Sequence, residues 1–172
     1  MIKRFFRRNN QSNEELPTPL QPGMNAPDFV LPSSMSRPIS LREFRGRPVV
    51  LAFYPADYSP VCSNQLALYN EGLHLFEEHD AQILGISADD LSSHQQFSES
   101  LNLGFPLLAD DDPAGSVASA YGVYNERDGK NERALFVVDA DGIIRWSYIV
   151  PRNVNPGADG ILENLENLPQ GK

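Results

Sequence analysis

The single cysteine of the chain, Cys62, is the residue best suited to nucleophilic chemistry. Ser59 and Pro60 precede it and resemble a helix start, in which a serine hydroxyl accepts from a backbone N–H and a proline takes the first helical position. Cys62 would then be the third helical residue, where unpaired N–H groups and the helix dipole favour a negative charge. Cysteines in such positions ionise readily and become nucleophiles. The pattern therefore indicates a reactive thiolate.

An inert core cysteine is the alternative interpretation of the same residue. Cys62 begins an apolar stripe at helical spacing, which continues through Leu66, Tyr69, Leu73 and Phe76. Free cysteines are among the most buried residue types. The preceding apolar strand favours the reactive interpretation, because the crevices of open α/β sheets lie at the carboxyl ends of their strands.

Other residue types that could do chemistry give weaker patterns. His74, His79 and His94 lack the spacing of a metal site, and we interpret them as satisfied surface histidines. The carboxylates of ADDD (109–112) and DADG (139–142) do not fit a calcium loop and predict a helix cap and a turn. A C-x-x-C redox motif is absent, since Ser59 occupies the place of the attacking sulfur. We expect no bound cofactor and no metal.

Composition indicates one domain behind a short tail. The chain has 172 residues and a formal net charge of −9, which disfavours nucleic acid as a partner. We expect residues 1–22 to be a disordered basic tail, with a weak membrane-surface or targeting role of Phe5 and Phe6 as the alternative, and residues 23–172 to be the folded domain.

The same features predict a cytoplasmic protein that does not enter a membrane. One cysteine cannot form an intramolecular disulfide, so a reducing cytosol is the expected compartment. The start MIKRFFRRNN lacks the apolar region of a secretory signal, and no stretch has the length of a membrane span.

The hydrophobic pattern predicts the elements that position Cys62. Strands are expected at 28–32, 37–41, 47–55, 81–87, 105–110 and in a hairpin around Asp141-Gly142 at 134–150. Helical segments are expected at 41–44, 60–76, from an Asp89 or Asp90 cap to 101, from an Asp112-Pro113 start to Gly122, and at 161–168. This order predicts a three-layer α/β domain with a mixed sheet, in which 47–55 is a central strand.

Several segments together resemble the peroxiredoxin family. PADYSPVC (55–62) matches its P-x-x-x-T/S-x-x-C motif, with Ser59 in place of the commoner threonine. The resemblance continues through APDFVL (26–31), FPLLADDD (105–112), AYGV (120–123) and ERALFVVDADGIIR (132–145). It implies a thioredoxin-like fold with a central mixed β-sheet flanked by helices.

The resemblance also implies a role for each matching residue. Cys62 would be the nucleophile that attacks peroxide, Pro55 would shield its thiolate from water, and the Ser59 hydroxyl would hydrogen-bond the peroxide. Arg133 would stabilise the thiolate and polarise the peroxide. Gln65 would either support the site with a hydrogen bond or be a solvated helix residue. Arg145 is expected to point outward beside Trp146.

The closest branch by resemblance is the single-cysteine type, similar to alkyl hydroperoxide reductase E or bacterioferritin comigratory protein. A resolving cysteine on the same helix would stand at position 67, which is Ala67. The implied activity is reduction of hydrogen peroxide or organic hydroperoxides through a sulfenic acid, regenerated by an external thiol of the thioredoxin, glutaredoxin or low-molecular-weight type. A homodimer is implied as well. The alternative is a peroxide sensor or a non-catalytic thioredoxin-fold interaction module.

Overall fold

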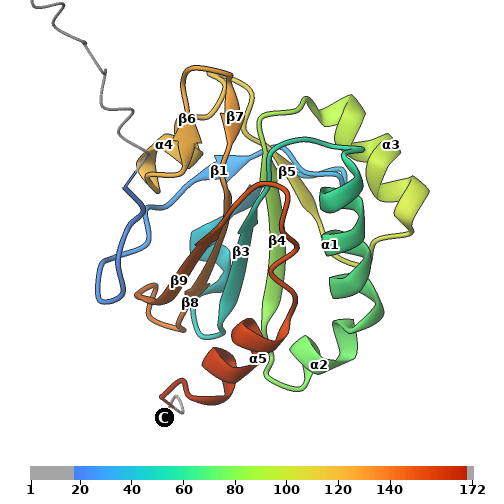
Figure 1. Ribbon diagram of the computed structural model, residues 1–172. Coiled ribbons are helices and arrows are strands. Elements are labelled where there is room, and N and C mark those ends of the chain that lie inside the picture. Colours follow the sequence, from blue (N-terminus) through green and yellow to red (C-terminus); the bar gives the residue numbers. More distant parts are fainter. Residues whose placement is uncertain (1–17, 170–172) are drawn as a thin grey trace, which may run out of the picture.

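A mixed β-sheet of five strands forms the centre of the computed structural model, which describes residues 18–169 (Figure 1). The strands lie in the order β5-β4-β3-β8-β9. Their bounds are β3 (Val49–Phe53), β4 (Gln82–Ser87), β5 (Leu107–Ala109), β8 (Arg133–Val138) and β9 (Ile144–Val150). β3, β4 and β5 are parallel, whereas β8 and β9 form an antiparallel hairpin next to β3. The mixed sheet predicted from the sequence is confirmed.

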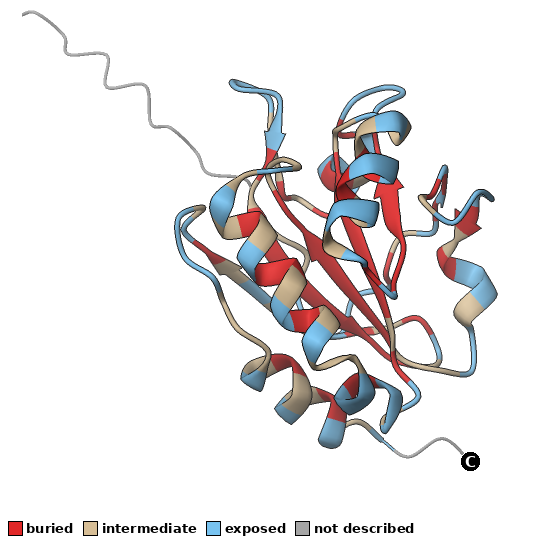
Figure 2. Cartoon of the chain, turned by 90° about the vertical axis from the view of Figure 1, so that its right-hand side faces the viewer, coloured by how far each residue is buried: buried red, intermediate tan, exposed pale blue. Residues whose placement is uncertain are grey.

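Strand β3 is the middle strand, and all its residues are buried. Side chains alternate between the faces of a strand, so Leu51 and Phe53 enter one core while Val50 and Ala52 enter the other. Figure 2 shows the buried strands enclosed by helices and loops. Two apolar cores therefore separate three layers, as predicted.

The two outer layers differ in composition. One contains β1 (Val30–Leu31), β2 (Ile39–Ser40), the 3₁₀ helix η1 (Leu41–Phe44) and α4 (Ser116–Ala120). The other contains α1 (Pro60–Glu71), α2 (Leu73–Glu77), α3 (Leu91–Leu101) and α5 (Asp159–Glu166). A small hairpin of β6 (Tyr124–Asn125) and β7 (Lys130–Asn131), which we did not predict, precedes β8.

Two helix boundaries differ from the prediction. The apolar stripe that begins at Cys62 is divided between α1 and α2, because α1 ends before Gly72 and glycine is a poor helix former. The predicted helix start at Asp112-Pro113 is wrong. That peptide bond is cis, and α4 begins later, at Ser116.

The carboxylate of Asp110 takes the place of the predicted cap. It accepts hydrogen bonds from the backbone N–H groups of Val117 (3.0 Å) and Ala118 (2.9 Å). The donors at the start of α4 are thus satisfied by an acid from the end of β5 rather than by the residue that directly precedes the helix.

The expected tail lies mostly outside the described residues, which begin at Thr18. Within the described part, Leu20 packs against the core that contains Leu51 and Phe53, and its N–H donates to the Tyr121 carbonyl at 3.0 Å. In residues 18–169 no helix has both the length and the hydropathy needed to cross a membrane.

Candidate active site

Cys62 lies at the start of α1, as the sequence predicts. Pro60 is the first residue of the helix, and the Ser59 hydroxyl oxygen accepts a hydrogen bond from the Cys62 backbone N–H at 3.2 Å. A loop of a few residues connects this helix to the carboxyl end of β3. The sulfur therefore lies where a helix N-terminus and the carboxyl edge of the sheet meet.

Arg133 reaches Cys62 because of the strand register. β8 runs antiparallel to β3, with Ala134 opposite Phe53, so the first residue of β8 lies at the carboxyl end of β3. Arg133 Nη2 donates to Cys62 Sγ at 3.4 Å, across 71 positions of sequence. The structure thus brings together the two residues to which the resemblance assigns the chemistry.

Arg133 is only 1% exposed, and its guanidinium is held by several acceptors. Nη1 donates to Gln65 Oε1 at 2.6 Å, while Nε and Nη2 donate to the Arg152 carbonyl oxygen at 3.1 and 2.7 Å. These oxygens are neutral. Among these acceptors the Cys62 sulfur is the one that can carry a full negative charge, and a buried cation favours an anion beside it.

Gln65 is buried and continues this network to α1 and the loop before α5. Its Nε2 donates to the Tyr69 hydroxyl, which donates to the Gly157 carbonyl, each at 3.0 Å. Burial raises the pKa of Tyr69 to about 12, although the Gln65 hydrogen bond and the Arg133 charge oppose the change. Of the two possibilities for Gln65, the supporting hydrogen bond is the one observed.

Arg152 is a site residue that sequence reasoning missed. Its guanidinium forms ion pairs with Asp128 and with Glu132, the latter at 3.1 Å. These ion pairs hold the segment whose backbone carbonyl, that of Arg152 itself, accepts from Arg133. The hydrogen bond from Arg152 lowers the pKa of Asp128 below its usual value. The sequence does not point to Arg152, because a residue of any type can supply a backbone carbonyl as an acceptor. Tyr69 could have been found, because it stands one helical turn after Gln65.

The Cys62 side chain has no exposed surface in this conformation. Ser59 is partly exposed at the helix start, and Pro55 is partly exposed in the preceding loop. Cys62 therefore belongs to the apolar core and also contacts a guanidinium. The expected shielding by Pro55 and peroxide contact of Ser59 stay predictions.

The remaining predicted residues have different outcomes. Arg145 points outward as expected, and its guanidinium binds Asp139 Oδ2 at 2.6 Å. His74 is exposed, but the prediction of a surface histidine is wrong for His94, which is fully buried. Burial is possible there because both ring nitrogens have hydrogen-bond partners. Across residues 18–169 no group of three or more His, Cys, Asp or Glu could hold a metal ion.

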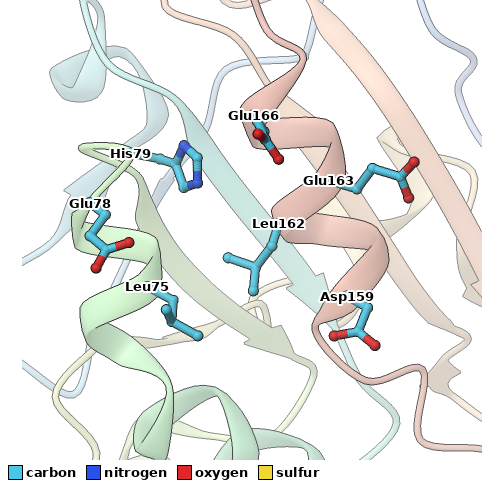
Figure 3. A pocket seen from close by; sticks show the side chains of 7 residues that line it. All are labelled: Leu75, Glu78, His79, Asp159, Leu162, Glu163 and Glu166. Carbon is cyan, nitrogen blue, oxygen red and sulfur yellow. The ribbon is translucent and has the colours of Figure 1, made fainter.

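A groove of about 360 Å³ lies between the end of α2 and α5 (Figure 3). It is lined by Leu75, Glu78, His79, Asp159, Leu162, Glu163 and Glu166. Cys62 and Arg133 are not among these residues. Its carboxylates make it a poor place for an anionic substrate.

A buried cysteine at a helix N-terminus, paired with an arginine on a mixed sheet, defines a thiol-based redox class of α/β protein. Comparison with known proteins specifies the family. A sequence model of the AhpC/TSA family matches residues 22–147. The chain belongs to this peroxiredoxin family, and with one cysteine it is of the single-cysteine type.

The relatives and a solved structure agree with this assignment. Alkyl hydroperoxide reductase E of Mycobacterium tuberculosis is 38% identical over 129 residues, 74% of this chain and 84% of that protein. Chloroplastic peroxiredoxin Q of Oryza sativa subsp. japonica is 36% identical over 127 residues, 73% of this chain but 58% of that protein. The crystal structure of peroxidoxin BcpB from M. tuberculosis has a TM-score of 0.78 at 29% identity, covering 88% of this chain and 99% of that one. The thioredoxin-like fold is thereby confirmed.

Proposed function

We propose that this protein is a thiol-dependent peroxidase that reduces hydrogen peroxide or organic hydroperoxides at Cys62. The observation that carries the proposal is the 3.4 Å contact between Arg133 Nη2 and Cys62 Sγ at the N-terminus of α1. Family membership and relatives named alkyl hydroperoxide reductase E and peroxiredoxin Q support it.

The reaction follows from the charges around the sulfur. The Cys62 thiolate attacks one peroxide oxygen, so an S–O bond forms as the O–O bond breaks. Negative charge develops on the departing oxygen, which leaves as water or an alcohol after taking up a proton. The Arg133 guanidinium stabilises that charge, because it is preorganised by Gln65 and the Arg152 carbonyl.

Ser59 and Pro55 have supporting roles in this proposal. The Ser59 oxygen already accepts from the Cys62 N–H, so its hydroxyl hydrogen is available to donate to a bound peroxide. Pro55 has no backbone N–H and presents an apolar ring that excludes water from the thiolate.

Regeneration requires an external thiol. One thiol condenses with the sulfenic acid, releasing water and forming a mixed disulfide, and a second thiol displaces Cys62 from that disulfide. We propose a reductant of the thioredoxin, glutaredoxin or low-molecular-weight class. Because the Cys62 side chain has no exposed area, peroxide and thiol must enter through a movement of the residues around it.

The finer assignments are proposals of the same kind. We propose a cytoplasmic homodimer whose catalytic domain comprises residues 23–172. The single cysteine supports the compartment, since no disulfide of the folded chain needs oxidising conditions.

Turnover with trapping of the intermediate tests the function. Reduced protein is mixed with less than one equivalent of hydrogen peroxide and then with dimedone, and the tryptic peptides are analysed by mass spectrometry. The proposal predicts a dimedone adduct on Cys62 and catalytic peroxide consumption when a thiol reductant is supplied. Rapid adduct formation without turnover under any thiol class would favour a sensor, and slow formation would defeat both.

A further inference from the structure

A second buried polar cluster contacts the loop that joins β3 to α1. At its centre is His94 of α3, whose Nδ1 lies 2.8 Å from Asp57 Oδ2 and whose Nε2 lies 3.0 Å from the Leu108 carbonyl oxygen. The His94 side chain is fully buried and that of Asp57 is 1% exposed. Asp57 belongs to the same loop as Pro55 and Ser59, so the cluster adjoins the proposed active site.

The side-chain polar atoms of His94 and Asp57 all have hydrogen-bond partners. A carbonyl oxygen can only accept, so His94 Nε2 carries a hydrogen that it donates to Leu108. Asp57 accepts from the Tyr54 hydroxyl at Oδ1 and from the Ser93 hydroxyl at Oδ2, each at 2.7 Å. Both ring nitrogens of His94 and both carboxyl oxygens of Asp57 therefore have hydrogen-bond partners inside the cluster.

The other ionisable groups nearby already have roles in the same cluster. Burial and the Asp57 carboxylate raise the pKa of Tyr54 well above its usual value, so its hydroxyl stays a donor. Asp89 Oδ2 accepts from the Asp57 backbone N–H at 2.9 Å and from the Ser87 hydroxyl at 2.5 Å. Asp89 thereby fixes the backbone at the residue whose side chain binds His94.

The loop has an unusual backbone conformation at the residue that follows Asp57. Tyr58 has a φ of 63°, in the left-handed region that aromatic residues rarely adopt. Its ring packs on Phe97 of α3 with centroids 4.9 Å apart. Contacts with α3 and the turn before it thus restrain Asp57 and Tyr58 just before Ser59, which caps Cys62.

We propose that His94 is a positioning residue for the reaction of Cys62 with peroxide. Through Asp57 it holds the loop that contains Pro55 and ends at Ser59, whose hydroxyl oxygen accepts from the Cys62 N–H. The inference rests on the proposed peroxidase function. His94 does not touch the reacting atoms, so its loss misplaces the loop without removing Arg133, and a misplacement of about 1 Å can cost about a hundredfold in rate.

Two amide variants separate the contributions of the two ring nitrogens. In His94→Gln the amide nitrogen reaches the position of Nε2, so the bond to Leu108 is kept and the bond to Asp57 is lost. In His94→Asn the amide nitrogen reaches the position of Nδ1 and keeps a donor to Asp57. His74→Gln, at an exposed position, is the matched control.

Two rate constants are measured for Cys62 in each variant, one with hydrogen peroxide and one with iodoacetamide. Both reactions need the thiolate, but alkylation does not need an aligned peroxide, so their ratio reports positioning. We expect His94→Gln to lower the peroxide-to-iodoacetamide ratio by about tenfold or more. His94→Asn should keep it within about threefold of the original protein, because the hydrogen bond to Asp57 remains. The His74 variant should not change it.

An unchanged ratio in a folded His94→Gln protein, or equal losses in both His94 variants, would overturn the inference. If the original protein itself reacts with peroxide no faster than a free thiolate, the proposed function fails instead, so the two failures are distinct. Should His94→Gln not fold, Ser93→Ala serves as the test, since it removes one hydrogen bond to Asp57. It should lower the ratio by about threefold, and no decrease would contradict the inference.

Discussion

Arg133 donates to Cys62, Gln65 and the Arg152 carbonyl from a position that is 1% exposed. A buried guanidinium without acceptors would be costly, so these partners must be assembled for the chain to fold around it. Cys62 and Arg133 were predictable because they belong to recognisable sequence patterns. The Arg152 carbonyl was not, because any residue type can supply a backbone acceptor.

Gln65 gives a prediction at this scale. Gln65→Leu removes the acceptor of Arg133 Nη1 and the donor to Tyr69, so buried polar atoms lose their partners. We expect the free energy of unfolding to fall by about 1–3 kcal/mol, measured by urea denaturation. Asn64→Leu, at an exposed neighbour on α1, should change it by less than about 0.5 kcal/mol. Equal effects of the two substitutions would contradict this assignment.

Tyr69 gives a prediction for alkaline pH. Burial raises its pKa to about 12, so the folded protein retains the phenol proton where the unfolded chain, titrating near 10, loses it. The contribution of the protonated Tyr69 phenol to the free energy of unfolding is therefore complete below pH 10 and is lost as the pH rises towards 12. The unfolding free energy should fall more steeply over this window than in Tyr69→Phe, by up to about 1.4 kcal/mol per pH unit. If the free energy of unfolding falls equally steeply with pH in the original protein and in Tyr69→Phe, this assignment is contradicted.

At the scale of elements, strand pairing brings together residues that are distant in sequence. The antiparallel register of β3 and β8 places Arg133 at the helix that carries Cys62. Apolar runs predict such strands, but their order in the sheet depends on packing between segments. Periodicity likewise does not show where a helix stops, as the division at Gly72 illustrates.

Asp110 gives the prediction that belongs to an element. Its buried carboxylate accepts from the backbone N–H groups of Val117 and Ala118 in the first turn of α4, so Asp110→Ala leaves those N–H groups unpaired. We expect a loss of about 1–3 kcal/mol in the free energy of unfolding, determined by thermal or urea denaturation. Asp111→Ala, at the exposed neighbour, is the control and should be nearly neutral.

At the scale of the whole molecule, the sequence predicts the layers, the central strand and the hairpin correctly. It could not predict that His94 is buried, because a histidine on a helix gives the same pattern whether its nitrogens face water or a carboxylate. The proposed homodimer is checked by light scattering coupled to size-exclusion chromatography. A mass near twice 19.1 kDa is expected, and a mass of one chain at micromolar concentration would contradict it.

Stopped-flow oxidation of Cys62 by hydrogen peroxide, compared between the original protein and Arg133→Ala, tests the central claim most directly. Arg42→Ala, at a side chain that is 74% exposed, controls for the loss of a positive charge. The account predicts oxidation far faster than that of a free thiolate, a loss of about a hundredfold or more in Arg133→Ala, and no change in Arg42→Ala. A folded Arg133→Ala protein that reacts at the original rate would contradict it.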